Sequence, residues 1–280
     1  MVKIIADTLS SIPVEEAKHL GIAYLPQIVI FGEESFRDDS EIDSETFIER
    51  LKSSPILPKT TAPYPHLYQL IFDELTRNND EILIICPSSK VSGTYGRAVV
   101  AAQEYPNSDI TVLDTPIIGA GLGSVIRMAV TMASGGKSAS EISKEVIDMS
   151  SRNRTYFLVD TLEYLQKGGR IGAAKALLGS VLQVKPILGI MDGEVKVIES
   201  LRTRKKALDR FIQMVINECP KTNSAFLNVQ HGGALEEAAS LSYLLIEKTG
   251  IREIPITNLP PAILVHGGPG LLGVSFFVEK

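Results

Sequence analysis

The chain has 280 residues, 44% hydrophobic and 22% charged, which is an ordinary composition for a globular protein and predicts two domains or one large one. The net charge of −5 and the lack of a long basic run argue against nucleic acid or an anionic membrane surface as partners. Two cysteines, Cys86 and Cys219, are too few for a disulfide framework and fit a reducing compartment. With no visible signal peptide and no apolar run of about eighteen residues, we expect a cytoplasmic protein without stable membrane insertion.

Strands and helices alternate along the first 150 residues, which predicts βαβ units and a parallel sheet. The run at 82–86 is continuous and β-branched, the pattern of a strand buried on both faces. Asp43 or Ser44 is expected to cap a helix, and Ser138 with Glu141 forms a capping-box pattern. Strands are predicted at 2–6, 22–31, 82–86 and 110–113, and helices at 46–51, 65–76, from about 94, at 118–132 and at 138–149.

The second half of the sequence lacks the regular βαβ alternation of the first half. Two strands at 184–191 and 194–201 flank Asp192-Gly193, which predicts an antiparallel hairpin with a type I′ turn. Further strands are expected at 156–159, 226–229, 253–256 and 274–278, and helices at 172–182, 203–218 and 234–248. We therefore predict an α/β fold in which a parallel-sheet domain, 1–150, is joined to a smaller α+β domain with a mixed or antiparallel sheet, 151–280, with a ligand cleft between them.

Small polar residues gather in four segments, at 7–11, 58–63, 87–94 and 266–270. The third leaves the carboxyl end of a buried parallel strand and enters a helix, which is where open α/β sheets bind ligands. Free N–H groups at the helix start and the Ser92 hydroxyl would suit an anion. For a single serine, helix capping is the simpler interpretation, whereas the cluster with its topology favours binding. For Thr60 and Thr61, the corresponding simple interpretation is that their hydroxyls stabilise a turn.

Several other patterns do not predict a site. Gly268 to Gly273 matches G-x-G-x-x-G but has no following helix to receive a pyrophosphate, and no phosphate-binding P-loop is present. His19, His66 and His231 lack metal-ligand spacing, so no metal or cofactor is expected. The basic run 202–206 lies at a predicted helix start, where the helix dipole does not favour positive charge. It is either a binding surface for a phosphate or acidic partner, or a solvated face.

Six stretches in order along the chain together resemble the DegV family. They are Asp-Thr-Leu-Ser at 7–10, Pro-Lys-Thr-Thr-Ala-Pro at 58–63, Ser-Ser-Lys-Val-Ser-Gly-Thr-Tyr at 88–95, Leu-Gln-Lys-Gly-Gly-Arg-Ile at 165–171, Arg-Thr-Arg-Lys-Lys-Ala at 202–207 and His-Gly-Gly-Pro-Gly at 266–270. The resemblance covers nearly the whole chain. One departure is Ala62, where many members of the family carry Gln.

The resemblance implies a bacterial lipid-binding protein that holds one long-chain fatty acid by its carboxylate. It further implies an acyl-binding subunit that is not itself an enzyme and presents the acid to a separate ATP-binding fatty acid kinase, which forms the acyl phosphate. The implied carboxylate-binding residues are Thr60, Thr61, Ser92, Gly93, His266 and Gly267. Arg170, Arg202 and His266 are the positions implied to face the kinase.

A fatty acid is physically compatible with these segments. Burying about fifteen methylenes at about 0.8 kcal/mol each gives a gross gain near 12 kcal/mol, from which ordering and association costs are subtracted. A buried carboxylate must be hydrogen-bonded, and neutral hydroxyl and N–H groups suffice. The glycine-rich start of helix 118–132 either packs closely on the sheet or leaves room for the acyl chain.

Two other functions stay open at this point. Ser92 could be the nucleophile and His266 the base of an acyl hydrolase or transferase, although no orienting acidic residue can be named. Alternatively, the chain could be a small-molecule kinase that resembles dihydroxyacetone kinase.

Overall fold

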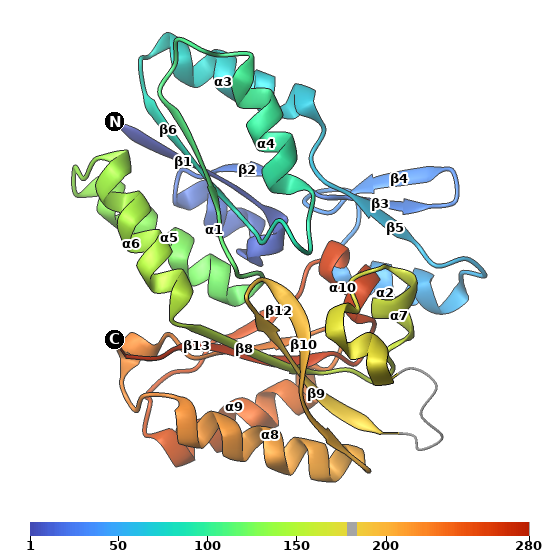
Figure 1. Cartoon of the computed structure of the whole chain (residues 1–280). Helices are drawn as coiled ribbons and strands as arrows, with labels where there is room; N and C mark the ends of the chain where they lie inside the picture. Colours follow the sequence, from blue (N-terminus) through green and yellow to red (C-terminus); the bar gives the residue numbers. More distant parts are fainter. Residues whose placement is uncertain (178–183, 280) are drawn as a thin grey trace.

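The first sheet of the computed structural model, which describes residues 1–177 and 184–279, is wholly parallel (Figure 1). Alternate side chains of the strand at 81–86 point to opposite faces. Ile82 and Ile84 pack on the helices at 65–77 and 94–103, while Leu83 and Ile85 pack on the helices at 14–19, 120–134 and 139–151. This burial on both faces explains the continuous apolar run. The strands in sheet order are β2 (Ala23–Leu25), β1 (Val2–Asp7), β6 (Glu81–Cys86) and β7 (Ile110–Asp114), and the helices are α1 (Val14–His19), α3 (Pro65–Arg77), α4 (Thr94–Gln103), α5 (Ala120–Ser134) and α6 (Ala139–Ser151).

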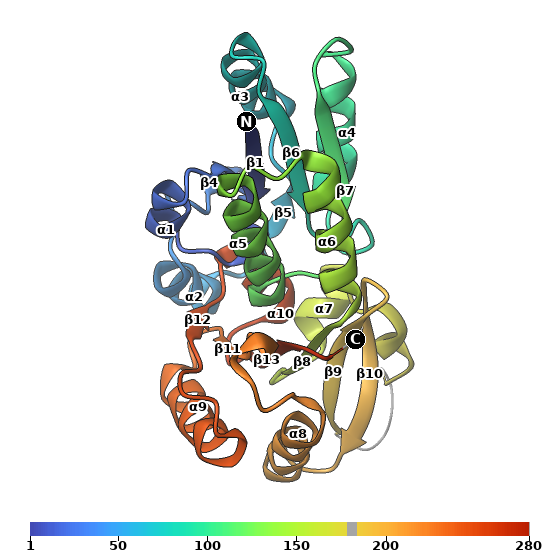
Figure 2. The same cartoon turned by 90° about the vertical axis from the view of Figure 1, so that its left-hand side faces the viewer.

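The second sheet is mixed, with one parallel pair, β11 (Asn228–His231) and β12 (Ile256–Asn258), among antiparallel neighbours. Helices α8 (Arg204–Glu218) and α9 (Leu235–Thr249) cover one face, and Figure 1 shows both below the sheet. Figure 2 shows α5 and α6 above the same sheet, beside the first one. The strands in sheet order are β10 (Glu194–Leu201), β9 (Lys185–Met191), β8 (Asn153–Leu158), β13 (Leu272–Phe277), β11 (Asn228–His231) and β12 (Ile256–Asn258). The predicted combination of a parallel sheet with a mixed one is confirmed.

A third, three-stranded sheet joins the two halves of the chain. It consists of β4 (Glu34–Arg37), β3 (Ile28–Phe31) and β5 (Lys59–Thr61), and it packs with α2 (Ser44–Ser53), α7 (Glu163–Lys167) and α10 (Pro261–Gly267). In this shared core, Phe47 and Ile48 of α2 lie in one apolar cluster with Leu264 and Val265 of α10. The two larger sheets lie on either side of residue 150, so we retain a division into 1–150 and 151–280 as a proposal.

Local signals located several elements correctly. Asp43 caps α2, its Oδ1 accepting from the Thr46 N–H at 2.8 Å, and Ser138 with Glu141 forms the expected capping box on α6. The hairpin turns at Asp192 and Gly193, whose φ angles of 52° and 80° fit a type I′ turn. Within the described residues, no helix is long and apolar enough to cross a membrane.

Other expectations were wrong. The strand expected at 22–31 is two strands in different sheets, because Pro26 between them has no N–H to continue a ladder. The loop expected at 58–63 contains β5, and His266 lies near the end of α10 rather than in a loop. Residues 172–177 form a 3₁₀ helix, and the rest of the helix expected at 172–182 lies outside the described residues. The strands expected at 226–229 and 253–256 occur later, as β11 and β12.

Candidate functional site

A largely apolar cavity lies between the second sheet, α10 and the loop that follows β6, with residues from both halves of the chain in its wall. Its empty space, open mouth included, is about 910 Å³. The apolar residues of the wall are Leu9, Ala62, Val91, Ile118, Phe157, Leu165, Ile190, Val195, Leu259, Ala262, Ile263 and Leu271.

Most of the predicted site residues meet in this cavity. Thr60, Ser92, Gly93, Arg170, His266 and Gly267 all line it. Thr61 does not, because neighbouring residues of a strand point to opposite sides; its hydroxyl lies 3.4 Å from the Ala62 carbonyl oxygen. Arg202 is exposed between β10 and α8 and is not part of the wall.

Ser92 is held in the turn between β6 and α4. Its N–H donates to the Ser88 carbonyl at 3.0 Å, and its hydroxyl lies 3.0 Å from the Thr94 hydroxyl. The Ser92 oxygen also accepts a long bond of 3.3 Å from the Thr94 N–H, so the capping interpretation holds in part. Gly93 is the N-cap residue of α4 and has no side chain to cover the first turn. Ser92 and Gly93 thus bring the residues just before the first turn of α4 into the cavity wall.

Thr60 of β5 is paired with His266 of α10. Thr60 Oγ1 and His266 Nε2 are 2.9 Å apart. Burial, and secondarily the charge of Arg170, lower the pKa of His266 to about 4, so the imidazole is neutral at physiological pH. Its buried Nδ1 has no hydrogen-bond partner among the described residues. A neutral ring that carries its hydrogen on Nε2 donates to Thr60, and the Thr60 hydrogen is then free for an acceptor in the cavity.

Position 168 must be glycine because the imidazole of His266 lies directly against its Cα. A Cβ at this position would lie 2.2 Å from His266 Nδ1, which no side chain tolerates. The basic glycine turn noted in the sequence therefore packs its backbone directly against the imidazole. This contact brings Arg170, two residues later, into the wall of the same cavity.

Three contacts fix the Ser92 turn from the second half of the chain. Arg170 Nε donates to the Val91 carbonyl at 3.0 Å. At the tip of the β9–β10 hairpin, the Gly193 carbonyl accepts from the buried Ser88 hydroxyl at 2.9 Å. Lys90 forms an exposed ion pair with Glu194 at 3.2 Å. The shape of the cavity mouth thus depends on how the two halves meet.

The sequence reasoning missed two buried glutamines in the wall, Gln27 and Gln230. Gln230 Oε1 accepts from the Ala120 N–H at 2.8 Å and lies where a Cβ on Gly119 would be, 2.5 Å away. β11 reads Asn-Val-Gln-His, so polar residues predominate in a strand that is buried throughout, and the strand expected at 226–229 ended one residue before Gln230. Gly121 packs equally closely on Asn153, with 2.7 Å from a Cβ to Nδ2, which supports the packing interpretation of the glycine-rich helix start.

The geometry does not favour an esterase-like site. His266 Nε2 is bonded to Thr60, and Ser92 is bonded to Thr94, so the proposed nucleophile and base are each engaged elsewhere. In the described part of the chain, no group of three or more His, Cys, Asp or Glu side chains could hold a metal ion.

Fold and cavity together define a class of α/β protein with three sheets and a largely apolar pocket whose wall includes hydroxyl and imidazole groups. The chain belongs to the DegV family: residues 1–279 match the family described as uncharacterised proteins of the DegV family. A DegV domain-containing protein of Halalkalibacterium halodurans is 30% identical over 280 residues, covering 100% of this chain and 99% of that protein.

Two solved structures share the fold over 99% of both chains. One is described as fatty acid binding of a DegV family protein from Thermus thermophilus, with a TM-score of 0.91 and 28% identity. The other is DegV of Bacillus subtilis, described as a fatty acid binding protein, with a TM-score of 0.87 and 30% identity.

Proposed function

We propose that this protein binds one long-chain fatty acid, with the acyl chain in the apolar cavity and the carboxylate between Thr60 and Ser92. The observation that carries the proposal is the arrangement of the cavity wall, in which the hydroxyls of Thr60 and Ser92, from distant segments, lie in a largely apolar surface. The likeness to relatives that are described as binding fatty acids supports it. Charge-assisted hydrogen bonds from hydroxyl and N–H donors suffice for a buried carboxylate.

The second part of the proposal is that the protein is a carrier in the cytoplasm and presents its ligand to a separate ATP-dependent kinase. In this role the chain has no catalytic residue of its own. Arg170 lines the cavity wall, and Arg202 is exposed at the start of α8, where it has no ion pair in the described structure. We assign these two arginines and His266 to the approach of the kinase.

Native mass spectrometry of the purified protein tests the ligand. We expect a mass excess of one fatty acid that disappears on denaturation, and a protein that stays empty after incubation with a series of fatty acids would refute the proposal. Ser92→Ala removes a donor to a charged acceptor, so the affinity should fall by roughly ten- to a hundredfold. Ser89→Ala, in the same turn but outside the cavity wall, is the matched control and should retain the ligand.

A coupled assay with the partner kinase and ATP tests the carrier role. Arg202→Ala should keep its fatty acid, because Arg202 lies outside the cavity wall, but should yield no acyl phosphate. A variant that is phosphorylated like the wild type would show that Arg202 is a solvated residue without a role in transfer.

A further inference from the structure

A row of hydrogen-bonded groups leads from the cavity wall to a buried carboxyl group at the end of β1 in the parallel sheet. Ser92 lines the cavity, its hydroxyl is 3.0 Å from that of Thr94, and Thr94 Oγ1 is 2.7 Å from Asp7 Oδ2. Asp7 ends β1 and is 1% exposed. Its carboxyl group also accepts from the Leu9 N–H at 3.1 Å and from Gln27 Nε2 at 2.6 Å. A buried carboxyl group is thus separated from the predicted ligand carboxylate by two hydroxyls.

The hydroxyl hydrogens of Thr94 and Ser92 can point in either of two directions along this row of hydrogen bonds. When Asp7 is ionised, Thr94 gives its single hydroxyl hydrogen to Asp7, and its oxygen accepts from Ser92 and from Gln27 Nε2, which is 2.9 Å away. When Asp7 is protonated, Asp7 donates to Thr94 and Thr94 donates to Ser92. The Ser92 hydrogen is then free for an acceptor in the cavity. Only in this second arrangement can Ser92 donate its hydrogen to a ligand carboxylate.

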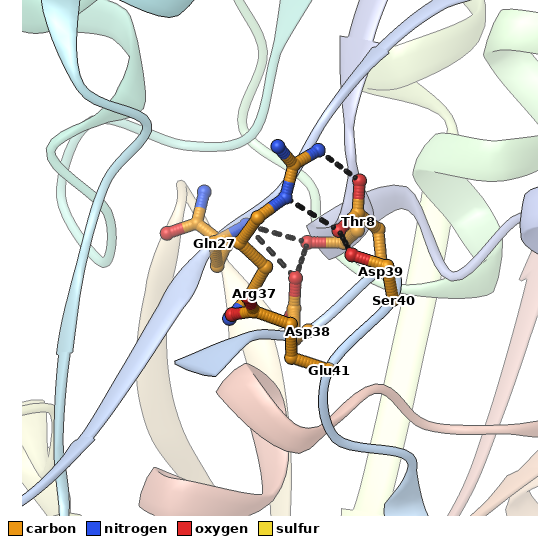
Figure 3. Close-up of polar contacts among 7 residues, drawn as sticks. All are labelled: Thr8, Gln27, Arg37, Asp38, Asp39, Ser40 and Glu41. Atoms are coloured by element: carbon orange, nitrogen blue, oxygen red, sulfur yellow. Dashed lines mark hydrogen bonds and ion pairs between the residues drawn. The ribbon is translucent and has the colours of Figure 1, made fainter. Parts of the chain in front are cut away.

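The second buried carboxyl group near Asp7 is that of Asp38. Asp38 accepts from the Thr8 hydroxyl at 2.8 Å and from the backbone N–H of Gln27 at 2.9 Å (Figure 3). Burial is the main cause that raises the pKa of Asp38 to about 8, and the charge of Asp7 adds to it. Asp38 is therefore largely neutral near pH 7.

The other titratable groups around Asp7 are uncharged near neutral pH, since burial raises the pKa of each. They are Tyr24 of β2, Tyr68 of α3 and Cys86 of β6. Arg97 of α4 is the cation in this region and acts on Tyr68. Within the described residues Asp7 has no ion pair, and burial raises its pKa to about 6. Of the two buried carboxyl groups, Asp7 is the one that is bonded to Thr94 and so connected to Ser92, and its protonation changes near neutral pH.

We propose that binding of a fatty-acid carboxylate at Ser92 is coupled to the uptake of one proton by Asp7. This inference rests on the proposed function, because it requires the ligand carboxylate at Ser92. Two buried negative charges in one hydrogen-bonded chain disfavour each other, so the pair retains one proton. The proton comes from solvent and binds Asp7 Oδ2, the hydrogens of Thr94 and Ser92 turn toward the ligand, and no other bond changes.

Titration calorimetry of the delipidated full chain with decanoate tests the coupling. Decanoate is a carboxylate like that of Glu, with a pKa near 4.3, and is ionised in solution at about pH 7. Measuring the heat in two buffers with different ionisation enthalpies gives the number of protons taken up per ligand. We expect more than half a proton near pH 7 and almost none near pH 5, where Asp7 is already protonated in the empty protein. The affinity should fall by up to tenfold per pH unit above pH 6.

Matched variants identify the group that takes the proton. Asp7→Asn keeps the shape but cannot titrate, so the uptake should vanish. Thr94→Val breaks the chain and should also abolish uptake, whereas Thr94→Ser keeps the hydroxyl and should preserve it. Asp38→Asn should leave the uptake unchanged. His266 borders the same cavity and could bind a proton instead, so His266→Gln is measured in parallel.

The outcomes separate the two proposals. If decanoate and longer acids produce no binding heat in the wild type, the proposed function is refuted and the coupling with it. If they bind without a buffer-dependent heat, the function stands and the coupling is refuted. An uptake that persists in Asp7→Asn, or that is lost in His266→Gln instead, also refutes the assignment to Asp7.

Discussion

Ser88 and Ser89 are neighbours in the Ser92 turn, yet the same substitution should affect them very differently. Ser88 is 2% exposed, and its hydroxyl donates to the Gly193 carbonyl at 2.9 Å and accepts from the Lys90 N–H at 3.3 Å. Ser88→Ala leaves a buried carbonyl without this donor, which costs about 1–3 kcal/mol. Ser89 is exposed, and its bond of 2.5 Å to Asp114 Oδ2 can be replaced by water. Ser89→Ala should therefore cost no more than about 1 kcal/mol.

Urea unfolding of both variants and of the wild type measures the difference. We expect the midpoint of Ser88→Ala to fall clearly below that of Ser89→Ala. Because the Ser88 bond fixes the turn that carries Ser92, Ser88→Ala should also release its fatty acid more readily, as native mass spectrometry would show. If Ser89→Ala destabilises the protein as much as Ser88→Ala, the hairpin contact does not hold the turn, and the reasoning fails.

Three further predictions concern separate parts of the site. Gly119 and Gly136 have similar positive φ angles, 73° and 79°, but a Cβ on Gly119 would meet Gln230 whereas one on Gly136 would meet nothing within 4 Å. Thermal unfolding should therefore show a clearly larger loss of stability for Gly119→Ala than the roughly 1 kcal/mol expected for Gly136→Ala. The pKa of His266 is about 4 in the folded protein and about 6.5 in the unfolded chain, so the unfolded state binds a proton first as the pH falls. The free energy of unfolding should therefore decrease by roughly 3 kcal/mol between about pH 6.5 and pH 4, and His266→Gln should remove this decrease. Arg204 contacts Asp160, Glu237 and the Gly270 carbonyl, so Arg204→Ala should lower the free energy of unfolding in urea by about 1 kcal/mol. Arg202 is exposed, so Arg202→Ala should leave that free energy unchanged.

The sequence predicted elements whose signals are local. The strand at 82–86 is apolar on both faces because helices cover both, and the hairpin forms at Asp192-Gly193 because these residues accept positive φ. The pairing of Thr60 with His266 could not be deduced in this way, since 206 positions separate them and short elements, β5 and α10, bring them together. The buried bonds of Gln27 likewise depend on tertiary packing.

Two of the expected site residues show the limit of motif reasoning. Thr60 and Thr61 have the same chemistry and adjacent positions, but in β5 only Thr60 reaches the cavity wall, since side chains alternate along a strand. The basic run 202–206 divides in a similar way: Arg204 is half-buried in ion pairs, whereas Arg202 is exposed. Residue type and order alone do not determine side-chain direction when the secondary structure is not known.

The shared core of α2, the third sheet and α10 has a consequence for building hybrids between relatives. A crossover at residue 150 would take Phe47 and Ile48 from one parent and Leu264 and Val265 from the other, although these four side chains pack in one cluster. It would also pair Thr60 and His266 from different parents. A functional hybrid should instead take residues 27–61 together with 151–280 from a single parent, so that the inherited unit follows the packing rather than the order of the chain.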